Sequence, residues 1–321
     1  MPLNSTLKLL LKLLISFGLL ALLSTRMDWA AIGRLLVSVN PTGWVGAMTL
    51  LFLQILTLGW RWKMMINGKN GTLSYAKALR MTLASHVANL FFISSISGIV
   101  VRIALARHHG LSLVRAACAT IADRAMTLTA LVILATVFIA PASQHMGSFI
   151  ARNTQWISII VLTLVVFSLF VFAPLVIQKI ISLLKESSRI KEILDYFNEI
   201  FSSPSLLFSI LLASLINQVF YFMAIFILTR ATGINLPALN IIAILPVIIL
   251  ISSLPISIGG WGVREGAFIY GLGMIGVSAE SAFLISVQIG LLGTLSVVLA
   301  GVPAILHKDI WGILKMKGAR A

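Results

Sequence analysis

Charged residues are scarce in this sequence, and acidic ones most of all. They make up 10% of the 321 residues, with nine Asp and Glu against 24 Lys and Arg. A soluble globular domain has about 25% charged residues. A chain with 59% hydrophobic residues and a mean hydropathy of +1.05 therefore cannot cover its surface in water. The single cysteine, Cys118, excludes an intrachain disulfide and a cysteine-rich metal site.

Sequence motifs of enzymes are absent as well. No H-E-x-x-H zinc motif, phosphate-binding glycine loop or G-x-S-x-G nucleophile motif occurs. We therefore expect no catalytic residue, no metal, no cofactor and no enzymatic activity. The net charge of +15 would suggest nucleic acid in a soluble protein. In a membrane protein basic residues hold the cytoplasmic loops inside, so no nucleic-acid partner is expected.

Long, continuous apolar runs fill the chain. An outer-membrane barrel would show alternating segments of about ten residues, so the runs predict helices. The fold class is predicted to be all-α: a polytopic transmembrane helical bundle of about six to eight spans, forming a single membrane domain over residues 1–321. The first run has no clear cleavage site and is expected to stay as a helix. The runs cover residues 13–23, 44–60, 82–101, 116–140, 156–177, 206–229, 239–258, 263–276 and 282–305.

Residues 182–201 have a different pattern. Apolar side chains recur there at helical spacing among charged ones, at Ile190, Ile193, Leu194, Phe197 and Phe201. The pattern predicts an amphipathic helix on the cytoplasmic membrane surface. A lever or lipid sensor and a plain solvated connector are both compatible with it.

The distribution of basic residues predicts the orientation. With the N-terminus inside, the outer loops hold four arginines, Arg26, Arg34, Arg152 and Arg230, and most of the other Lys and Arg fall on the inner side. This asymmetry favours a multi-pass membrane protein with both termini in the cytoplasm.

Two apolar segments are interrupted. Residues 82–101 have basic stretches at both ends, so a full crossing would leave a basic loop outside, whereas a re-entrant hairpin from the cytoplasm would not. Residues 239–276 break between Pro255 and Gly262 and would enter from the outside. The two segments can be inverted counterparts, the pattern that marks the binding site of transporters. An ordinary kinked helix is the alternative.

Ionisable residues inside apolar segments are costly, so the few present are candidates for function. They are Asp123 and Arg124 in one span, Arg264 and Glu265 after the glycine break, and Arg102 at the end of the first interrupted segment. Adjacent residues on a helix do not face each other. We therefore expect cross-pairing, such as Asp123 with Arg264 or Arg124 with Glu265. An ion-pair network that holds the bundle and a cavity that engages an anionic head group are compatible interpretations.

The break itself is rich in glycine. Gly98 interrupts the first segment, and Pro255, Gly259, Gly260, Trp261 and Gly262 interrupt the second. A helix that starts near Trp261 would direct free N–H groups at the break, which predicts an anion site. Simple helix packing through Gly262 and Gly266, and an interfacial role for Trp261, are the alternatives.

The segment LPISIGGWGVREGAFI, residues 254–269, resembles the signature of the lysylphosphatidylglycerol synthase transmembrane-region family. A second block, residues 89–131, is similar to the family in its Asn89, Gly98, Arg102 and Asp123-Arg124. The chain departs from the family at Ser94 or Ser95, where proline is common. It also departs at Ile99-Val100, where an acid often follows the glycine, and at Thr127, which lies where an acid often follows the acidic-Arg pair. These departures leave the substrate open.

The resemblance implies a flippase-like protein that moves a lipid with an anionic head group. A phospholipid, an aminoacyl-phospholipid and a polyprenyl phosphate all remain open. Lipid and bilayer would be its partners, and a homo-oligomer is compatible with the sequence. In fused family members aminoacyl transfer belongs to a separate cytosolic domain, and only a short basic tail follows residue 305 here. The alternatives are a lipid-modifying enzyme and a non-transporting partner of a glycolipid or polysaccharide system.

Overall fold

The computed structural model describes residues 5–91, 95–142, 188–253, 257 and 260–306, and every regular element within them is a helix. The all-α prediction is thus confirmed. The predicted span 156–177 and the basic tail lie outside the described residues. The helices are α1 (Ser5–Ser24), α2 (Trp29–Ser38), α3 (Pro41–Asn67), α4 (Tyr75–Phe91), α5 (Ser95–His108), α6 (Leu113–Ala142), α9 (Ser188–Phe201), α10 (Pro204–Ala231), α11 (Ala238–Ser252), α12 (Val263–Gly273) and α13 (Ala279–Leu306).

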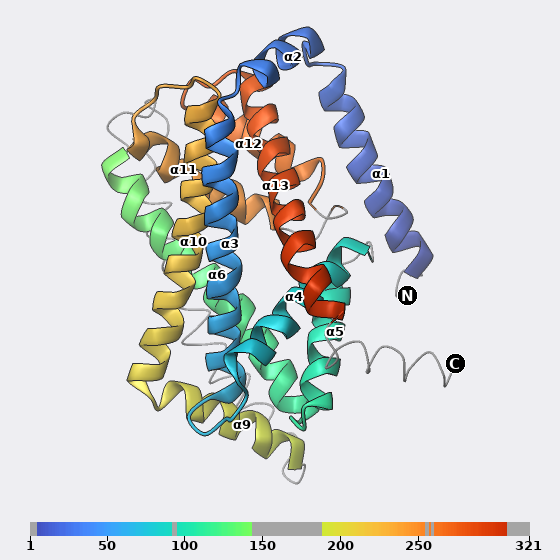
Figure 1. Ribbon diagram of the computed structural model, residues 1–321, viewed down its shortest axis with the longest axis vertical. Helices are drawn as coiled ribbons and strands as arrows, with labels where there is room; N and C mark the ends of the chain where they lie inside the picture. Colours follow the sequence, from blue (N-terminus) through green and yellow to red (C-terminus); the bar gives the residue numbers. More distant parts are fainter. Residues whose placement is uncertain (1–4, 92–94, 143–187, 254–256, 258–259, 307–321) are drawn as a thin grey trace.

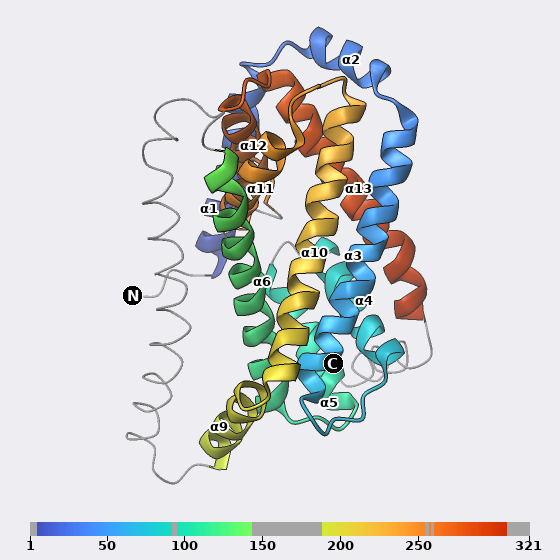
Figure 2. The same cartoon turned by 90° about the vertical axis from the view of Figure 1, so that its left-hand side faces the viewer.

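Four of these helices, α3, α6, α10 and α13, are long and apolar enough to cross a membrane. They contain the predicted runs 44–60, 116–140, 206–229 and 282–305. Figures 1 and 2 show them as the long helices of the bundle, with α3 and α10 side by side in both views. The protein is therefore a membrane-embedded, multi-pass helical protein.

The contact between α3 and α10 depends on small residues. A side chain at Gly43 would collide with Ala231, and Ala47 and Ala224 are fully buried in the core. Helices in lipid associate by close backbone approach because no hydrophobic effect drives them together. Gly43 and Ala231 allow that approach at one end of the pair.

The two interrupted segments form helical hairpins. The helices α4, α5, α11 and α12 have 17, 14, 15 and 11 residues, so even α4 is only about 25 Å long, against a hydrocarbon core of about 30 Å. In each pair the two helices pack against each other. The prediction of two interrupted segments is confirmed, and the alternative of single kinked helices is wrong.

The hairpins enter from opposite ends of the bundle. The pair α4–α5 lies between the end of α3 and the start of α6, at the lower end in Figure 1. The pair α11–α12 lies between the end of α10 and the start of α13, at the upper end. Opposite entry agrees with the suggestion from sequence that the two segments are inverted counterparts, and an inverted symmetry between them stays a prediction.

The helix α9 lies at the lower end of the bundle (Figures 1 and 2) and packs against α6 and α10. Tyr196 and Ile200 are 2% and 3% exposed and belong to a core cluster with Trp62 and Met65 of α3. The hydroxyl of Tyr196 donates to the carbonyl of Met65 at 3.2 Å. The helical prediction holds for Ser188–Phe201, whereas 182–187 lie outside the described residues. One side of α9 thus packs on protein, whereas Phe201 is 44% exposed, and its position on the cytoplasmic membrane surface stays a prediction.

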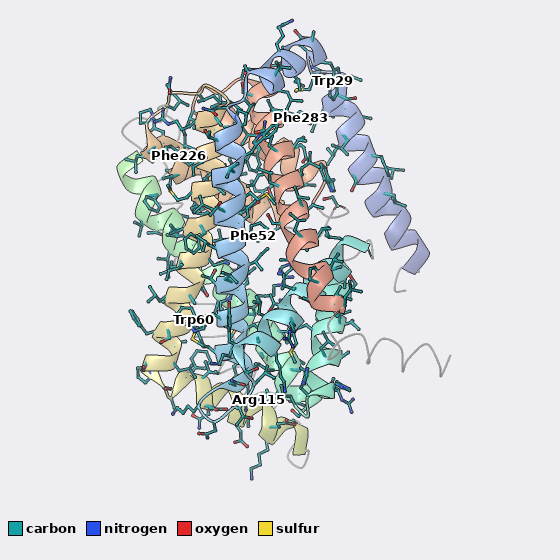
Figure 3. The ribbon with its side chains drawn as sticks, in the orientation of Figure 1. Trp29, Phe52, Trp60, Arg115, Phe226 and Phe283 are labelled. Atoms are coloured by element: carbon teal, nitrogen blue, oxygen red, sulfur yellow. The ribbon has the colours of Figure 1, made fainter. Side chains whose placement is uncertain are left out.

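An ion pair fastens α9 to the bundle. The guanidinium of Arg115, labelled at the lower end in Figure 3, lies 3.0 Å from the Glu199 carboxylate, which also accepts from the Lys69 backbone N–H at 2.6 Å. Burial opposes ionisation of Glu199, but these two donors outweigh it and hold the pKa of the carboxyl below its usual value. The helix α9 is therefore docked at neutral pH and loses this support as the pH falls through the lowered pKa.

The upper end is closed by α2, which links α1 to α3. The Asp28 carboxylate caps α2 by accepting from the Ala31 N–H at 3.0 Å. Trp29 packs edge-on against Phe283 of α13 at 6.0 Å, and both are labelled in Figure 3. The helix α1 descends along the outside of the bundle and contacts α12 (Figure 1).

Candidate functional site

A cavity of about 950 Å³ lies inside the bundle and reaches both hairpins. Residues of α3, α4, α5, α6, α10 and α11 line it. Ligand sites have volumes of about 300–1,000 Å³, so this cavity can hold a lipid head group. Its apolar wall includes Ile99, Leu128, Leu131, Ile249 and Leu250, and its charged wall consists of Arg61, Arg102, Asp123 and Arg124.

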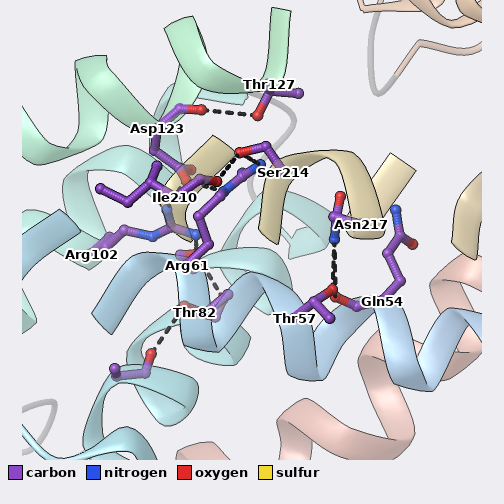
Figure 4. A network of polar contacts seen from close by, with 12 residues as sticks. Gln54, Thr57, Arg61, Thr82, Arg102, Asp123, Thr127, Ile210, Ser214 and Asn217 are labelled. Carbon is purple, nitrogen blue, oxygen red and sulfur yellow. Dashed lines mark hydrogen bonds and ion pairs between the residues drawn. The ribbon is translucent and has the colours of Figure 1, made fainter. Parts of the chain in front are cut away.

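Asp123 holds two arginines from different helices (Figure 4). Its Oδ1 lies 2.8 Å from Nε of Arg61 on α3, and its Oδ2 lies 3.1 Å from a guanidinium nitrogen of Arg102 on α5. The exposed fractions of Arg61, Arg102 and Asp123 are 2%, 8% and 8%. Buried charges in a bundle must be paired. This triad therefore joins α3, α5 and α6 around one wall of the cavity.

Neutral groups complete the environment of the two arginines. Arg61 donates to Ser214 of α10 at 3.3 Å, and Arg102 donates to Ser85 of α4 at 3.2 Å. The Arg102 guanidinium also lies over the Trp62 ring, 4.6 Å from its centroid. A guanidinium is attracted to the face of an aromatic ring. The position of Arg102 is thus determined by three helices besides its own.

Arg61 is the residue that the sequence analysis missed. The count of basic residues placed it in a cytoplasmic stretch, whereas α3 continues to Asn67 and buries it. The signal was present in the sequence: no glycine or proline interrupts the chain between Trp60 and Gly68. A helix continued to that glycine would have placed Arg61 inside the span.

Arg124 follows Asp123 on α6 and has a different environment. It is exposed and lines the cavity, and within the part of the chain that the structure describes it forms no ion pair. The predicted pairing of Arg124 with Glu265 is therefore wrong. Arg124 presents an uncompensated cation to the cavity.

Two further polar groups of the cavity wall have no hydrogen-bond partner. Gln218 of α10 is 4% exposed, and its side-chain nitrogen, a donor, has no partner among the described residues. Nε2 of His86 on α4, a donor or an acceptor according to the tautomer, has none there either. A buried polar group without a partner costs about 1–3 kcal/mol. Arg124 and Gln218 thus present donors to the cavity that no described acceptor satisfies.

Asn89 joins the two helices of the first hairpin. Its Oδ1 accepts from the Gly98 backbone N–H at 2.7 Å, so α4 caps the first turn of α5. Ser97 donates to the carbonyl of Ala88 at 3.1 Å. A side chain at Gly98 would collide with the Ser85 carbonyl and with Asn89. Gly98 is therefore required for the close approach of the two helices.

Gly98→Ala is expected to destabilise the protein by about 1–3 kcal/mol, the usual cost of overpacking. The measurement is thermal unfolding of the purified variant in detergent. Gly18→Ala on α1 is the matched control, because no atom lies within 4 Å of the added methyl group. An unchanged midpoint for Gly98→Ala would contradict this hairpin geometry.

The second hairpin carries the pair Arg264 and Glu265. The two side chains bind each other, with 2.7 Å between a guanidinium nitrogen and Oε1, so the predicted pairing of Asp123 with Arg264 is wrong. Both also contact Ser286 of α13 at 3.3 Å. The rule that adjacent residues diverge applies to the helix surface. Here both residues lie in the first turn of α12, where the Arg264 side chain reaches back over Trp261, 4.4 Å from the ring centroid.

Glu265 occupies the predicted anion site. Its Oε2 accepts from the Gly262 N–H at 2.6 Å, so the chain's own carboxylate caps α12. Gly260 and Gly262 have φ of +82° and +86°, and a side chain at Gly262 would press on Leu19 of α1. The start of α12, from Gly260 to Glu265, is therefore a sharp turn that the chain's own carboxylate closes, and it is called the elbow below. Pro255 and Gly259 of this break lie outside the described residues.

A smaller cavity of about 290 Å³ lies beside Arg264. It shares Gln54, Leu58, His86, Asn89 and Tyr221 with the large one. A side chain at Gly290 of α13 would collide with the Arg264 guanidinium. The predicted residues thus form two groups: Arg102, Asp123 and Arg124 at the large cavity, and Arg264 with Glu265 at the small one.

The described residues contain no cluster of three or more His, Cys, Asp or Glu side chains that could hold a metal ion.

A family model described as the lysylphosphatidylglycerol synthase TM region matches residues 9–301. The chain belongs to this family. No curated protein matches the chain. The match to the lysylphosphatidylglycerol synthase TM-region model includes both hairpins, the long helices α3, α6 and α10, and α13 as far as residue 301.

Proposed function

We propose that this protein moves a lipid with an anionic head group across the bacterial inner membrane. The observation that carries the proposal is the large cavity, which combines an excess of arginine with an apolar wall and reaches both hairpins. A lipid has the same two parts, a charged head and an apolar chain. Arg binds phosphate oxygens through its planar fork of donors.

The two hairpins suggest how access alternates. Discontinuous helices that enter from opposite ends meet at the substrate site in many transporters, and rocking of one repeat against the other opens the site to each side in turn. In this chain the large cavity lies against α4, α5 and α11, and the small one extends from its shared wall to Arg264. We propose that the head group passes through these two spaces.

The orientation in the membrane follows from charge. The lower end of the bundle in Figure 1 carries Lys69, Lys77, Arg107, Arg115 and Lys191 at or near the ends of α3, α4, α5, α6 and α9. The upper end carries Arg26, Arg34 and Arg230. The positive-inside rule places the lower end in the cytoplasm. We propose on this basis that both termini are cytoplasmic, the orientation that the sequence also predicts.

Arg124→Gln is expected to reduce lipid movement by about 10- to 100-fold, the loss of one charge-assisted hydrogen bond of about 1.5–3 kcal/mol. The variant should fold normally because Arg124 is exposed to the cavity and has no ion pair there among the described side chains. The measurement is the rate at which acyl-labelled phosphatidylglycerol in proteoliposomes becomes accessible to a membrane-impermeant quencher.

Arg34→Gln is the matched control for that assay, because it removes an exposed arginine from α2, outside both cavities. Unchanged transport by a well-folded Arg124→Gln variant would remove the cavity from the mechanism. No movement of any lipid by the wild type, with aminoacyl transfer from charged tRNA instead, would favour a lipid-modifying enzyme.

A further inference from the structure

The charge of the large cavity is unbalanced. Its wall holds three arginines and one aspartate, which corresponds to a net formal charge of about +2 at neutral pH. Because Asp123 already binds Arg61 and Arg102, the excess is presented mainly by Arg124. A ligand that fills this space must supply negative charge.

The acidic residues that the structure describes do not offset that excess. Of the nine, Glu186 and Asp309 lie outside the described residues. Asp28 and Glu280 cap or begin helices at the upper end, and three more lie on α9 at the lower end, Glu192, Asp195 and Glu199. Asp123 and Glu265 are the two that lie beside the cavities.

Both of these carboxylates are saturated. Asp123 gives one oxygen to Arg61 and the other to Arg102. Glu265 is fully buried, with one oxygen on the Gly262 N–H and the other on Arg264. An ammonium group needs a free acceptor when it leaves water. Among the described residues, neither cavity offers it a carboxylate.

The unpartnered groups of the wall point the same way. The side-chain nitrogen of Gln218 lacks an acceptor, and Arg124 has no ion pair among the described residues. A phosphate oxygen satisfies both groups. A head group that also carries ammonium groups would add charge repulsion with Arg124 and would need acceptors of its own.

From this balance we infer the substrate class, an inference that rests on the proposed function. The site takes lipids whose head group is a net anion. It favours a phosphate monoester over a phosphodiester and rejects aminoacylated head groups. A phosphate monoester carries about −1.5 to −2 at pH 7, which matches the excess charge, and a phosphodiester carries one negative charge. Esterification of phosphatidylglycerol with lysine adds an α-amino and an ε-amino group and turns the head group into a net cation. The selectivity is thus opposite to what the family's name suggests.

The test uses four lipids with identical dioleoyl chains, so that the head group alone differs. They are phosphatidic acid, phosphatidylglycerol, lysyl-phosphatidylglycerol and phosphatidylcholine as the neutral reference. Proteoliposomes report the transbilayer rate of each. Thermal stabilisation of the wild type in detergent by each lipid reports binding.

The expected order is phosphatidic acid, then phosphatidylglycerol, then phosphatidylcholine, with the lysyl lipid last. Phosphatidic acid and the lysyl lipid should differ by at least about tenfold in transbilayer rate and in apparent affinity. Arg124→Gln lowers the excess positive charge of the cavity by one. It is therefore expected to narrow the difference in rate between phosphatidic acid and phosphatidylglycerol, whereas Arg34→Gln should leave that difference unchanged.

The outcomes separate the inference from the proposed function. If the lysyl lipid moves and binds as well as phosphatidylglycerol, the inference is wrong and lipid transport stands. If no lipid moves but binding keeps the expected order, the selectivity stands and the proposed transport fails. If no lipid moves and binding does not depend on the head group, both fail.

Discussion

Asp123→Asn is expected to destabilise the protein by about 3–5 kcal/mol, the cost of removing one partner from a buried ion pair. The substitution keeps the shape of the side chain but leaves Arg61 and Arg102, 2% and 8% exposed, without a counter-charge. Among the residues that the structure describes, no other carboxylate lines the large cavity to replace it. Thermal unfolding in detergent, monitored by intrinsic fluorescence, measures the loss.

Two variants complete that experiment. Asp195→Asn removes an exposed carboxylate on α9 and should change stability by less than about 0.5 kcal/mol. Arg61→Met combined with Asp123→Asn should recover part of the loss, because it removes one of the two orphaned charges. If Asp123→Asn unfolds at the wild-type temperature, the triad does not hold the bundle, and its three charges serve the substrate alone.

Glu265→Ala is expected to cost a similar amount, about 3–5 kcal/mol. Glu265 is fully buried, and its removal leaves the Gly262 N–H without an acceptor and Arg264 without its ion pair. The loss is concentrated at the start of α12. Hydrogen exchange should therefore increase first at the α12 amides, well before α3 or α10 responds.

Glu265→Gln separates the two roles of this side chain. Its amide oxygen can still accept from the Gly262 N–H, so the elbow is kept while the charge opposite Arg264 is lost, and the cost should fall to about 1–3 kcal/mol. Glu280→Ala is the control, since it removes a half-exposed acid from the first turn of α13 and should cost about 0.3–1 kcal/mol. Equal losses for Glu265→Ala and Glu280→Ala would contradict the described elbow.

The opposite entry of the two hairpins was predictable from sequence. The segment 82–101 has basic residues at both ends, and α4 and α5 do begin and end at one side of the bundle. Charge and hydropathy act on each segment separately, because lipid rejects an uncompensated charge wherever it lies along the chain. The same local rule explains why Arg102, Asp123, Arg124, Arg264 and Glu265 could be singled out before any helix was placed.

The same local rule did not predict two features, the packing of α9 on the bundle and the burial of Arg61. Residues 188–201 have the pattern of an interfacial helix, and a contact with protein gives the same pattern as a contact with lipid. The packing of Tyr196 and Ile200 into the core is decided by α3, α6 and α10, which lie elsewhere in the chain. Arg61 was misplaced because the apolar run ends at Trp60, although α3 does not.

The sequence alone determined that this chain is a helical membrane protein with two broken segments, and it singled out five charged residues in or at the ends of apolar segments, because these are properties of composition and order. The tertiary structure decided which charges meet. Asp123 binds Arg61 and Arg102, Arg264 binds its own neighbour, and Arg124 is left to the cavity. Ion pairing requires side chains from several helices to converge within about 4 Å, and that convergence depends on which helix faces pack together.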